Sequence, residues 1–413
     1  MEDWNWNREK NIIADVGKAL KEHPKIQQFV VSPDGEHIAA TVKNEDGEFT
    51  AWVNGEFWPG SYEMLWNLKY LPNGKLIALV KAEDQWTLAV DKEPWTEKFE
   101  YAWEPKLSAN GEGLAVIYKR DDMYGIALNG KPWDTGFLSI RDYCISPDGK
   151  RTAATVQVEA LKEADVPGFF KGVWSVAMDG SVWDRKYVNT WKPVFSPNSS
   201  KVAVEIRTGI CEYSAAADDQ PWSESFGGVW EPLFRPDDSS AIAPVKHQGK
   251  WTLAEDGRPI WGGYGQLWQA RFSPDGSRLA AVVAPQFGRW TIAVDDHPWE
   301  KLFSDMVLAP VFSPDGRSVA AIVKHNDVWS IAVDGKAWAE TFDMIWDPVF
   351  SPCGKHVAAK AEKDGRFHLV VDGELRDNSY ERLWEPVFSP RGDSLLLRYI
   401  ENGKYVREVA RSQ

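Results

Sequence analysis

The chain reads Phe-Ser-Pro-Asp-Gly at residues 312–316, then Val-Ala-Ala-Ile-Val at 319–323 and Trp-Ser-Ile-Ala-Val-Asp-Gly at 329–335. The same order of residue types recurs ten times along the 413 residues, at intervals of 37 to 50 residues. A period in this range indicates a repeat architecture. The proline position of the phrase falls at Pro33, Pro72, Ala109 (a substitution), Pro147, Pro197, Pro236, Pro274, Pro314, Pro352 and Pro390.

One repeat predicts four short strands. The Ser-Pro-Asp-Gly turn ends the first, because proline presets φ and glycine accepts a positive φ. A Val-Ala-Ala-x-Val segment forms the second strand. The third opens with an aromatic residue and runs into Asp-Gly or Asn-Gly, the dipeptides that a two-residue type I′ hairpin favours. The fourth is short and ends in tryptophan. Asx-Gly dipeptides of this kind stand at 54–55, 129–130, 179–180 and 334–335.

Four antiparallel strands in about 38 residues make one propeller blade. The sequence therefore predicts an all-β fold, a single β-propeller of about ten four-stranded blades over residues 28–413. Two smaller, five-bladed propellers are the alternative. The repeats run on without a linker, and the one irregular interval follows the fourth copy rather than the fifth, which favours a single propeller.

Both ends of the chain contribute to this prediction. The tenth repeat stops after its third strand, near Ala410, and Trp4-Asn5-Trp6 is the candidate for the missing fourth strand. We therefore expect residues 1–27 to supply a closing strand and one short amphipathic helix over 12–20, where apolar residues have helical spacing. Residues 157–171 lengthen the fourth interval and are predicted to form a loop between the second and third strands of their blade.

The 23 tryptophans fall almost entirely into three positions of the repeat. The first slot opens the third strand and exchanges Trp, Tyr and Phe freely, which indicates core packing. The second slot closes the fourth strand, is tryptophan until Arg376 interrupts it, and is also interpreted as packing. The first slot comprises Phe49, Trp86, Tyr124, Trp174, Tyr213, Trp251, Trp290, Trp329, Phe367 and Tyr405; the second comprises Trp58, Trp95, Trp133, Trp183, Trp222, Trp261, Trp299 and Trp338.

The third slot lies four residues before the phenylalanine position of the phrase. In propellers the first strand lines the central channel, so this slot is expected near one channel mouth. Two interpretations stand: packing between blades, or a row of indoles that binds an apolar partner or stacks on sugars. Gln27, Arg141 and Leu308 interrupt the row. The candidate binding residues are Trp66, Trp103, Trp191, Trp230, Trp268, Trp346 and Trp384.

Composition excludes several classes of function. The net charge of −14 and the pI near 5.1 argue against a binder of duplex nucleic acid, which needs clustered Lys and Arg. The three cysteines are far apart and form no CxxC motif. The N-terminus lacks the order of a signal peptide, and no run of about 18 apolar residues occurs. We expect a cytoplasmic protein with no direct membrane insertion.

Catalytic motifs are missing as well. There is no Gly-x-Ser-x-Gly, no phosphate-binding glycine loop and no His-Glu-x-x-His, and the seven histidines are scattered. One aspartate per turn does not give the dense oxygen spacing of a calcium loop. The sequence therefore predicts no enzyme activity, no metal site and no cofactor, and a propeller hydrolase is disfavoured.

The Phe-Ser-Pro-Asp-Gly repeats resemble the WD40-like repeats of TolB-type propellers over residues 27 to 410. The whole chain, with ten tryptophan-bearing repeats, acidic character and no cofactor motif, resembles the tryptophan-rich subunit of the Tmc transmembrane electron-transfer complexes of sulfate-reducing bacteria. This resemblance implies a cytoplasmic, non-catalytic subunit, held at the inner membrane by cytochrome and iron–sulfur partners that carry the electrons.

The leading functional hypothesis is therefore a protein-interaction scaffold. The third-slot tryptophans and the 157–171 insertion are its expected contacts. The alternative is a propeller that binds a carbohydrate or another small ligand with its channel-mouth tryptophans.

Overall fold

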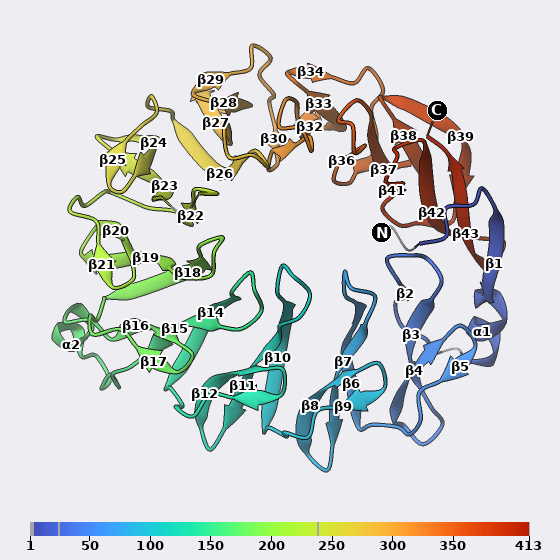
Figure 1. Ribbon diagram of the computed structural model, residues 1–413, viewed down its shortest axis with the longest axis horizontal. Helices are drawn as coiled ribbons and strands as arrows, with labels where there is room; N and C mark the ends of the chain where they lie inside the picture. Colours follow the sequence, from blue (N-terminus) through green and yellow to red (C-terminus); the bar gives the residue numbers. More distant parts are fainter. Residues whose placement is uncertain (1–3, 24, 238, 413) are drawn as a thin grey trace. The chain divides into compact units, whose positions relative to one another are not determined.

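A computed structural model describes residues 4–23, 25–237 and 239–412. They form ten antiparallel sheets of four strand positions each, and in three sheets the first strand is interrupted and counts as two short pieces. Figure 1 shows these sheets as successive blades along the chain. The predicted fold class, a β-propeller of ten four-stranded blades, is confirmed.

The blades follow the order of the repeats, and each is described by its strands. Blades 1 to 5 contain β2 Val30–Val31, β3 Ile38–Lys43, β4 Phe49–Val53 and β5 Glu56–Phe57; β6 Met64–Tyr70, β7 Leu76–Ala82, β8 Gln85–Val90 and β9 Glu93–Pro94; β10 Tyr101–Leu107, β11 Leu114–Arg120, β12 Met123–Leu128 and β13 Lys131–Pro132; β14 Ser139–Ile145, β15 Thr152–Gln157, β16 Trp174–Met178 and β17 Ser181–Val182; and β18 Asn189–Phe195, β19 Val202–Gly209, β20 Glu212–Ala217 and β21 Gln220–Pro221.

Blades 6 to 10 repeat this order. They contain β22 Leu233–Phe234, β23 Ala241–His247, β24 Lys250–Glu255 and β25 Arg258–Pro259; β26 Gln266–Phe272, β27 Leu279–Gln286, β28 Arg289–Val294 and β29 His297–Pro298; β30 Met306–Val307, β31 Val311–Phe312, β32 Val319–His325, β33 Val328–Val333 and β34 Lys336–Ala337; β35 Met344–Ile345, β36 Val349–Phe350, β37 Val357–Lys363, β38 Arg366–Val371 and β39 Glu374–Tyr380; and β40 Arg382–Leu383, β41 Val387–Phe388, β42 Ser394–Glu401, β43 Lys404–Arg411 and β1 Lys10–Asp15.

The structure divides into two compact units. Unit 1 comprises residues 1–82, 89–93 and 271–413, and unit 2 comprises residues 83–88 and 94–270. Unit 1 thus holds blades 1, 8, 9 and 10 and most of blades 2 and 7, and unit 2 holds blades 3 to 6. The third-slot tryptophans belong to both units, whereas the apolar patch and the basic pocket described below each lie within one unit.

The Ser-Pro-Asp-Gly turn is closed by its own serine. In blade 8 the Ser313 hydroxyl donates to Asp315 Oδ1 at 2.6 Å and accepts the backbone N–H of Ser318 at 3.0 Å. Ser313 is fully buried, so these bonds satisfy a polar group that water cannot reach. The phrase therefore recurs because each of its residues has a role in ending the first strand and starting the second.

The Asx residue of the hairpin between the third and fourth strands also ties that hairpin to the second strand. Asp334 accepts the Val319 N–H through Oδ1 at 2.8 Å, and its own N–H donates to the Val319 carbonyl at 2.9 Å. Its φ of 47° is the conformation that Asn and Asp tolerate best after glycine. The same pair of bonds recurs at Asn54–Ile38, Asp91–Leu76, Asn129–Leu114, Asp179–Thr152, Asp218–Val202, Asp256–Ala241, Asp295–Leu279 and Asp372–Val357.

The second-slot tryptophans pack against the hairpin of the following blade. Trp299 contacts Gly335 so closely that a β-carbon there would lie 3.2 Å from the tryptophan side chain. The series needs one correction. In blade 6 the N–H that bonds back to the third strand belongs to Ile260, as that of Trp338 does in blade 8, so Trp261 lies one residue beyond the slot. The predicted tryptophan at this position is wrong because residues 258–260 hold the place that residues 336–338 hold in blade 8.

A further aromatic series, which the sequence reading missed, accompanies the first slot. Each member lies 13 residues after a first-slot aromatic and pairs with it across an antiparallel bridge. All but one, Tyr62, are buried. The spacing alone would have revealed them as Tyr62, Phe99, Phe137, Tyr187, Phe226, Tyr264, Phe303, Phe342 and Tyr380.

The tenth sheet takes strands from both ends of the chain, as predicted, but from a different segment. β1 pairs antiparallel with β43, with Lys10 opposite Glu408 and Asp15 opposite Lys404. Trp4 and Trp6 lie outside any strand and stack on each other with ring centroids 6.1 Å apart. The predicted segment 4–6 is wrong because β43 has eight residues and the six-residue β1 pairs with far more of it than three residues can.

The N-terminal helix is shorter than predicted. α1 spans Val16–Glu22, and Asp15 caps it by accepting the Lys18 N–H at 2.8 Å. Residues 12–15, which the apolar spacing placed in the helix, belong to β1 instead. Pairing with β43 overrides the local helical pattern, since tertiary context outweighs propensity.

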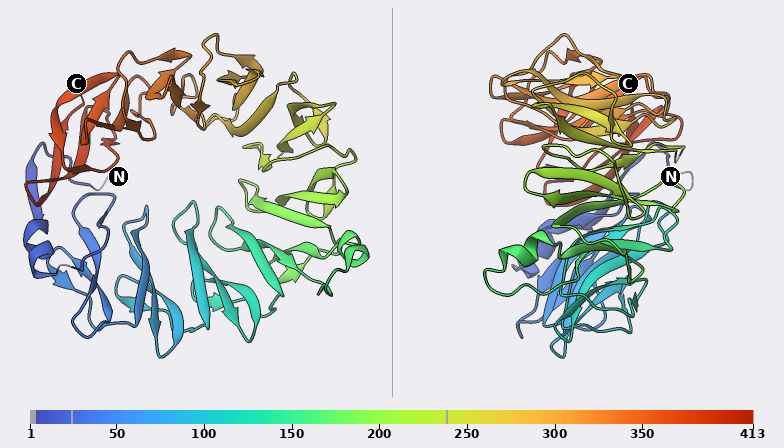
Figure 2. Two further views of the ribbon diagram at one scale, coloured as in Figure 1. Left: turned by 180° about the vertical axis from the view of Figure 1, so that it is seen from behind. Right: turned by 90° about the vertical axis from the view of Figure 1, so that its left-hand side faces the viewer.

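Residues 158–173 connect β15 to β16 and contain one helical turn, α2, over Val166–Phe170. Asp165 caps this turn by accepting the Gly168 N–H at 2.9 Å, and no residue of α2 is buried. Figure 2 shows α2 standing out from the strands of its own blade. The predicted loop therefore presents a short helix at the end of blade 4.

Candidate functional site: a first-strand row, an apolar patch and a basic pocket

The third-slot tryptophans lie on or beside the first strand of their blades. Neighbouring residues cover only part of each side chain, and the rest is exposed to solvent. Trp66 and Trp230 are 44% and 49% exposed, and the other five are half-buried. In blades 3, 5, 6, 9 and 10, one side of the ring meets the first-slot aromatic of the same blade. These pairs are Trp103–Tyr124, Trp191–Tyr213, Trp230–Trp251, Trp346–Phe367 and Trp384–Tyr405.

The pair in blade 6 is the most open. Trp230 stacks on Trp251 with centroids 5.5 Å apart and planes 17° apart. In blade 4, where the slot holds Arg141, the guanidinium lies 3.9 Å from the centroid of Trp174 and forms a cation–π contact. A flat group therefore covers the first-slot aromatic in both blades, whether it is an indole or a guanidinium.

The residue after the third slot begins a β-bulge. Glu104 and Lys192 have φ of 54° and 50°, and the register between first and second strands shifts just beyond them. A bulge of this kind redirects the side chain of the extra residue. In blades 3 to 6 the residues after the slot are Glu104, Asp142, Lys192 and Glu231. We call the side chains at these two positions of blades 3 to 6 the unit 2 row.

Glu205 lies beneath this row, opposite Trp191 in the register of β18 and β19. Burial, and then the negative charges of Asp142 and Glu231, raise the pKa of Glu205 to about 8, and Lys192 opposes the shift. Glu205 is therefore largely protonated at neutral pH. The row carries acidic side chains around a buried carboxyl group, which disfavours anionic ligands there.

Replacing Glu205 by Gln tests whether the buried carboxyl group is protonated in the folded protein. The pKa of the Glu205 carboxyl group is 4.5 in the unfolded chain and about 8 in the folded protein. Between these pH values the folded state binds one more proton than the unfolded state, so the free energy of unfolding falls as pH rises from 4.5 to 8. We expect Glu205→Gln to change the free energy of unfolding little at pH 5 and to raise it by on the order of 2–4 kcal/mol at pH 8.5. Urea unfolding at both pH values checks this, and a difference independent of pH would contradict it.

Exposed apolar side chains gather at one end of the blades in unit 2, where second strands turn into third strands and where first strands begin. Blades 3 to 5 are consecutive, and β14 packs against both β10 and β18. Tyr101 also contacts Trp103, with centroids 5.6 Å apart, which joins this end to the unit 2 row. We call this set the unit 2 patch; it comprises Tyr101, Leu138, Leu161, Val166, Phe170 and Ile210.

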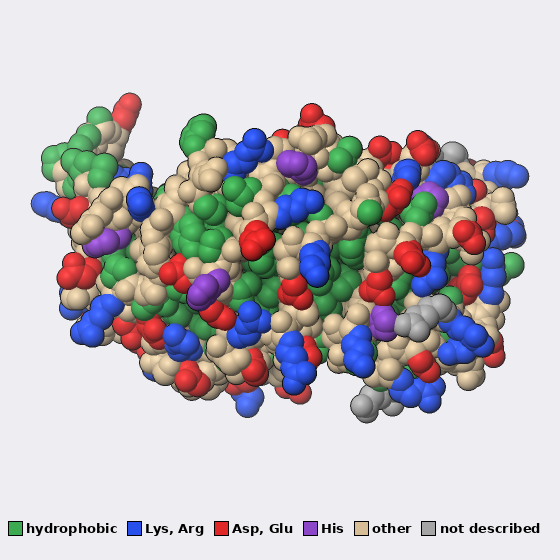
Figure 3. All heavy atoms as spheres, turned by 90° about the horizontal axis from the view of Figure 1, so that it is seen from above, with side chains coloured by type: hydrophobic (Ala, Val, Ile, Leu, Met, Phe, Trp, Pro, Cys, Tyr) green, Lys and Arg blue, Asp and Glu red, His purple; other side chains and the backbone are tan. Residues whose placement is uncertain are grey.

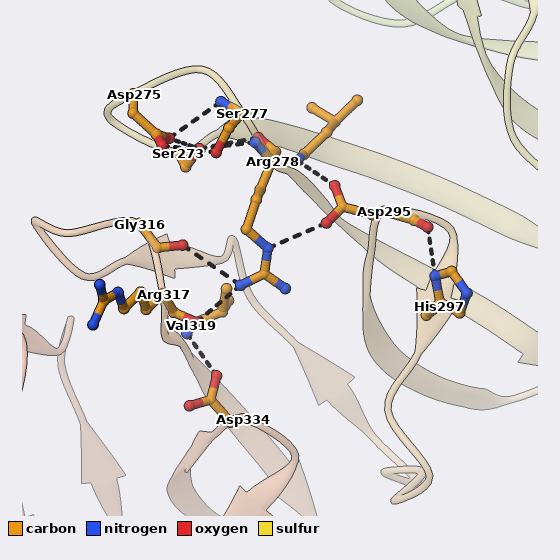
Figure 4. Close-up of polar contacts among 11 residues, drawn as sticks. Ser273, Asp275, Ser277, Arg278, Asp295, His297, Gly316, Arg317, Val319 and Asp334 are labelled. Atoms are coloured by element: carbon orange, nitrogen blue, oxygen red, sulfur yellow. Dashed lines mark hydrogen bonds and ion pairs between the residues drawn. The ribbon is translucent and has the colours of Figure 1, made fainter.

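A basic pocket of about 820 Å³ lies between blades 7 and 8 in unit 1. Arg278 crosses it: Nε donates to Asp295 Oδ2 at 3.1 Å, and Nη1 donates to the Arg317 carbonyl at 2.8 Å. Figure 4 shows Arg278 held between the turns of the two blades. His297 Nδ1 donates to the Asp295 carbonyl at 2.7 Å, which fixes the ring. The other charged lining residues are Glu300, Lys301, Arg317, Asp334 and Lys336.

Within the described residues, no group of three or more His, Cys, Asp or Glu side chains is placed to hold a metal ion. No helix in the described ranges is long and apolar enough to cross a membrane. Cys144, Cys211 and Cys353 are free thiols.

No family model matches the chain, and no curated protein matches it in sequence. Among solved structures it is similar to a eukaryotic initiation factor (11% identity, TM-score 0.45, covering 82% of this chain and 94% of that one). It is also similar to the Dos1 propeller (11%, 0.38, 98% and 95%) and to TolB from Acinetobacter baumannii (12%, 0.32, 76% and 77%). At these identities and scores the function must be argued from the residues of this chain.

Proposed function

We propose that this protein is a non-catalytic scaffold that binds a protein partner through the unit 2 patch and the adjoining unit 2 row. One observation carries the proposal: exposed apolar side chains of three consecutive blades share one end of unit 2. Exposed apolar side chains that group on one surface mark sites of interaction with a partner. Three of these residues belong to the 157–171 insertion, and the helix of that insertion, α2, has no buried side chain.

The charge around the patch selects the partner. Glu100, Asp121 and Asp122 lie at the same end of blade 3, where Lys119 pairs with Glu100 and Asp122. The unit 2 row adds three acidic side chains against one lysine and one arginine. Apolar surface bordered by acidic groups is complementary to a partner surface of apolar and basic residues. The resemblance to the Tmc tryptophan-rich subunit supports a more specific proposal, in which the partners are cytochrome and iron–sulfur subunits and the protein lies on the cytoplasmic side of the inner membrane.

Charge insertion into the patch provides the test. The double variant Leu138→Lys and Val166→Lys is expected to reduce recovery of the partner at least tenfold, since two lysines disrupt apolar contacts. The readout is affinity purification of the tagged chain from its native cells, with haem absorbance and non-haem iron measured in the eluate.

The control places the same change on side chains of comparable type elsewhere in unit 2. Val182 and Ile260 are each 39% exposed, close to the 40% of Leu138, but lie at the opposite end of their blades. Val182→Lys with Ile260→Lys should leave recovery unchanged. Equal loss in both double variants, or a wild-type eluate without haem and iron, would contradict the proposed partner class.

A second candidate function is binding of a carbohydrate through the third-slot tryptophans. The exposure of Trp230 favours it, because an exposed indole stacks on the apolar face of a sugar ring. A glycan panel followed by tryptophan fluorescence tests it. Trp230→Ala should abolish any quenching, whereas a signal that persists in this variant assigns the sugar to another site.

A further inference from the structure

We propose that the basic pocket between blades 7 and 8 binds a small molecule that carries a diphosphate group. The charge balance of the pocket is the starting point. Four cationic side chains and one histidine line it, against two carboxylates, in a chain whose net charge is −14. Two further carboxylates, Asp295 and Asp315, pair with Arg278 and Arg317 from outside the lining. In the face shown in Figure 3, basic and acidic side chains are interspersed with apolar surface.

The fold does not require these cations. An equivalent pocket of about 450 Å³ lies between blades 1 and 2, where one lysine faces two carboxylates. Alignment of the repeats shows the replacements: Arg278, His297, Lys301 and Lys336 correspond to His37, Glu56, Gly60 and Glu93. The position of Arg317 keeps a basic residue, Lys75, but the same architecture exists without the other three cations, so packing does not account for Arg278, Lys301 and Lys336.

The cationic groups are available to a ligand. Arg278 uses Nε and Nη1 to hold its position, and among the described residues its Nη2 makes no hydrogen bond. Lys301 and Lys336 form no ion pair with any residue in the described ranges, and the Lys301 ammonium group lies 5.7 Å from the ring centroid of Phe303. A fixed guanidinium with a free N–H edge, beside two unpaired ammonium groups, suits phosphoryl oxygens.

The size of the pocket sets the ligand class. A volume of about 820 Å³ exceeds what a single phosphate fills and falls in the range of sites for organic ligands. Trp299 and Pro298 supply an apolar wall for the organic part. Because the cations come from both blades, they can contact two linked anionic groups at once, whereas a single phosphate would contact only some of them. A compound with a diphosphate and an apolar or aromatic moiety fits these features.

Isothermal titration calorimetry of the full chain with inorganic pyrophosphate, ADP, citrate and sulfate tests the proposal. We expect pyrophosphate and ADP to bind, ADP more tightly because it reaches the apolar wall, and citrate and sulfate to bind at least tenfold more weakly. If all four bind alike, or if pyrophosphate and ADP show no heat at millimolar concentration, the proposal is overturned.

Two variants use residues that the fold already accepts at the same positions. His297→Glu and Lys336→Glu copy Glu56 and Glu93, and each is expected to weaken pyrophosphate binding at least tenfold while the unfolding midpoint in urea stays unchanged. Lys92→Glu in the equivalent pocket is the control and should leave affinity unaltered. Equal affinity in all three variants would assign the anion to another surface and would overturn the assignment.

Discussion

Replacing Gly113 by alanine is expected to lower the free energy of unfolding by about 3 kcal/mol or more. A β-carbon at Gly113 would lie 2.5 Å from the carbonyl oxygen of Gly149 and 2.7 Å from its α-carbon. Both atoms belong to the backbone of the neighbouring turn and cannot move aside as a flexible side chain does. The substitution therefore forces the turns of blades 3 and 4 apart.

The contact is close because these two turns are bonded to each other. Asn110 donates through its side chain to the Asp148 carbonyl at 2.8 Å and through its backbone N–H to the Pro147 carbonyl at 3.2 Å. Repeat 3 is also the one with alanine in place of the proline of the phrase. The nested turns leave no room for a side chain at Gly113.

Urea unfolding followed by tryptophan fluorescence measures this effect, and Gly249→Ala is the control. Gly249 has a φ of 81°, but a β-carbon there meets nothing within 4 Å, so only backbone strain of about 1 kcal/mol is expected. Gly113 is not in the left-handed region. Backbone preference alone therefore predicts a larger loss of stability for Gly249→Ala than for Gly113→Ala. A larger loss for Gly249→Ala would contradict the steric explanation.

Replacing Arg407 by methionine is expected to cost about 3 kcal/mol of stability. Arg407 is 1% exposed in its side chain, and its Nε donates to the Asp34 carbonyl at 2.8 Å and pairs with Glu36 at 2.9 Å. Its Nη2 donates to the Asn5 carbonyl at 2.5 Å. One side chain on β43 thus joins the turn of blade 1 to the N-terminal segment, and methionine leaves both carbonyls without this donor.

The measurement is again the urea midpoint, combined with limited proteolysis of the N-terminal segment, which should become faster. Arg391→Met provides the control because that side chain is 84% exposed and its ion pair with Asp393 contributes little. The expected change there is within about 0.5 kcal/mol. Equal stability of Arg407→Met and the wild type would show that the buried arginine is replaceable by apolar packing.

Much of the fold was readable from the sequence because each repeat encodes its own turns. Ser313 and Asp315 close one turn by local hydrogen bonds, and Asp334 with Gly335 forms the hairpin that follows. These contacts lie within about twenty residues of one another. The hairpin bonds recur in nine repeats, whereas Leu71 and Arg235 replace the serine of the turn in repeats 2 and 6. The same inference is thus tested many times within one chain. Blade number and strand order follow directly.

The errors fall where distant segments meet. The helical spacing of residues 12–20 gave no sign that β43, nearly 400 residues later, would pair with residues 10–15. The shift from Trp261 to Ile260 depends on a hydrogen bond to Leu253 that a tryptophan count does not reveal. Neither the basic pocket nor the buried Glu205 has a motif, because their residues come from different strands and blades.

The sequence by itself determined the blades of this protein: their number, their four strands and the aromatic residues that fill them. Local turn chemistry and the alternation of a strand need only nearby residues. Tertiary structure alone decided which face of each indole is covered, which charges share a pocket and which strand completes the tenth sheet. Those outcomes depend on distances between side chains far apart in the chain, and a repeat pattern carries no information about them.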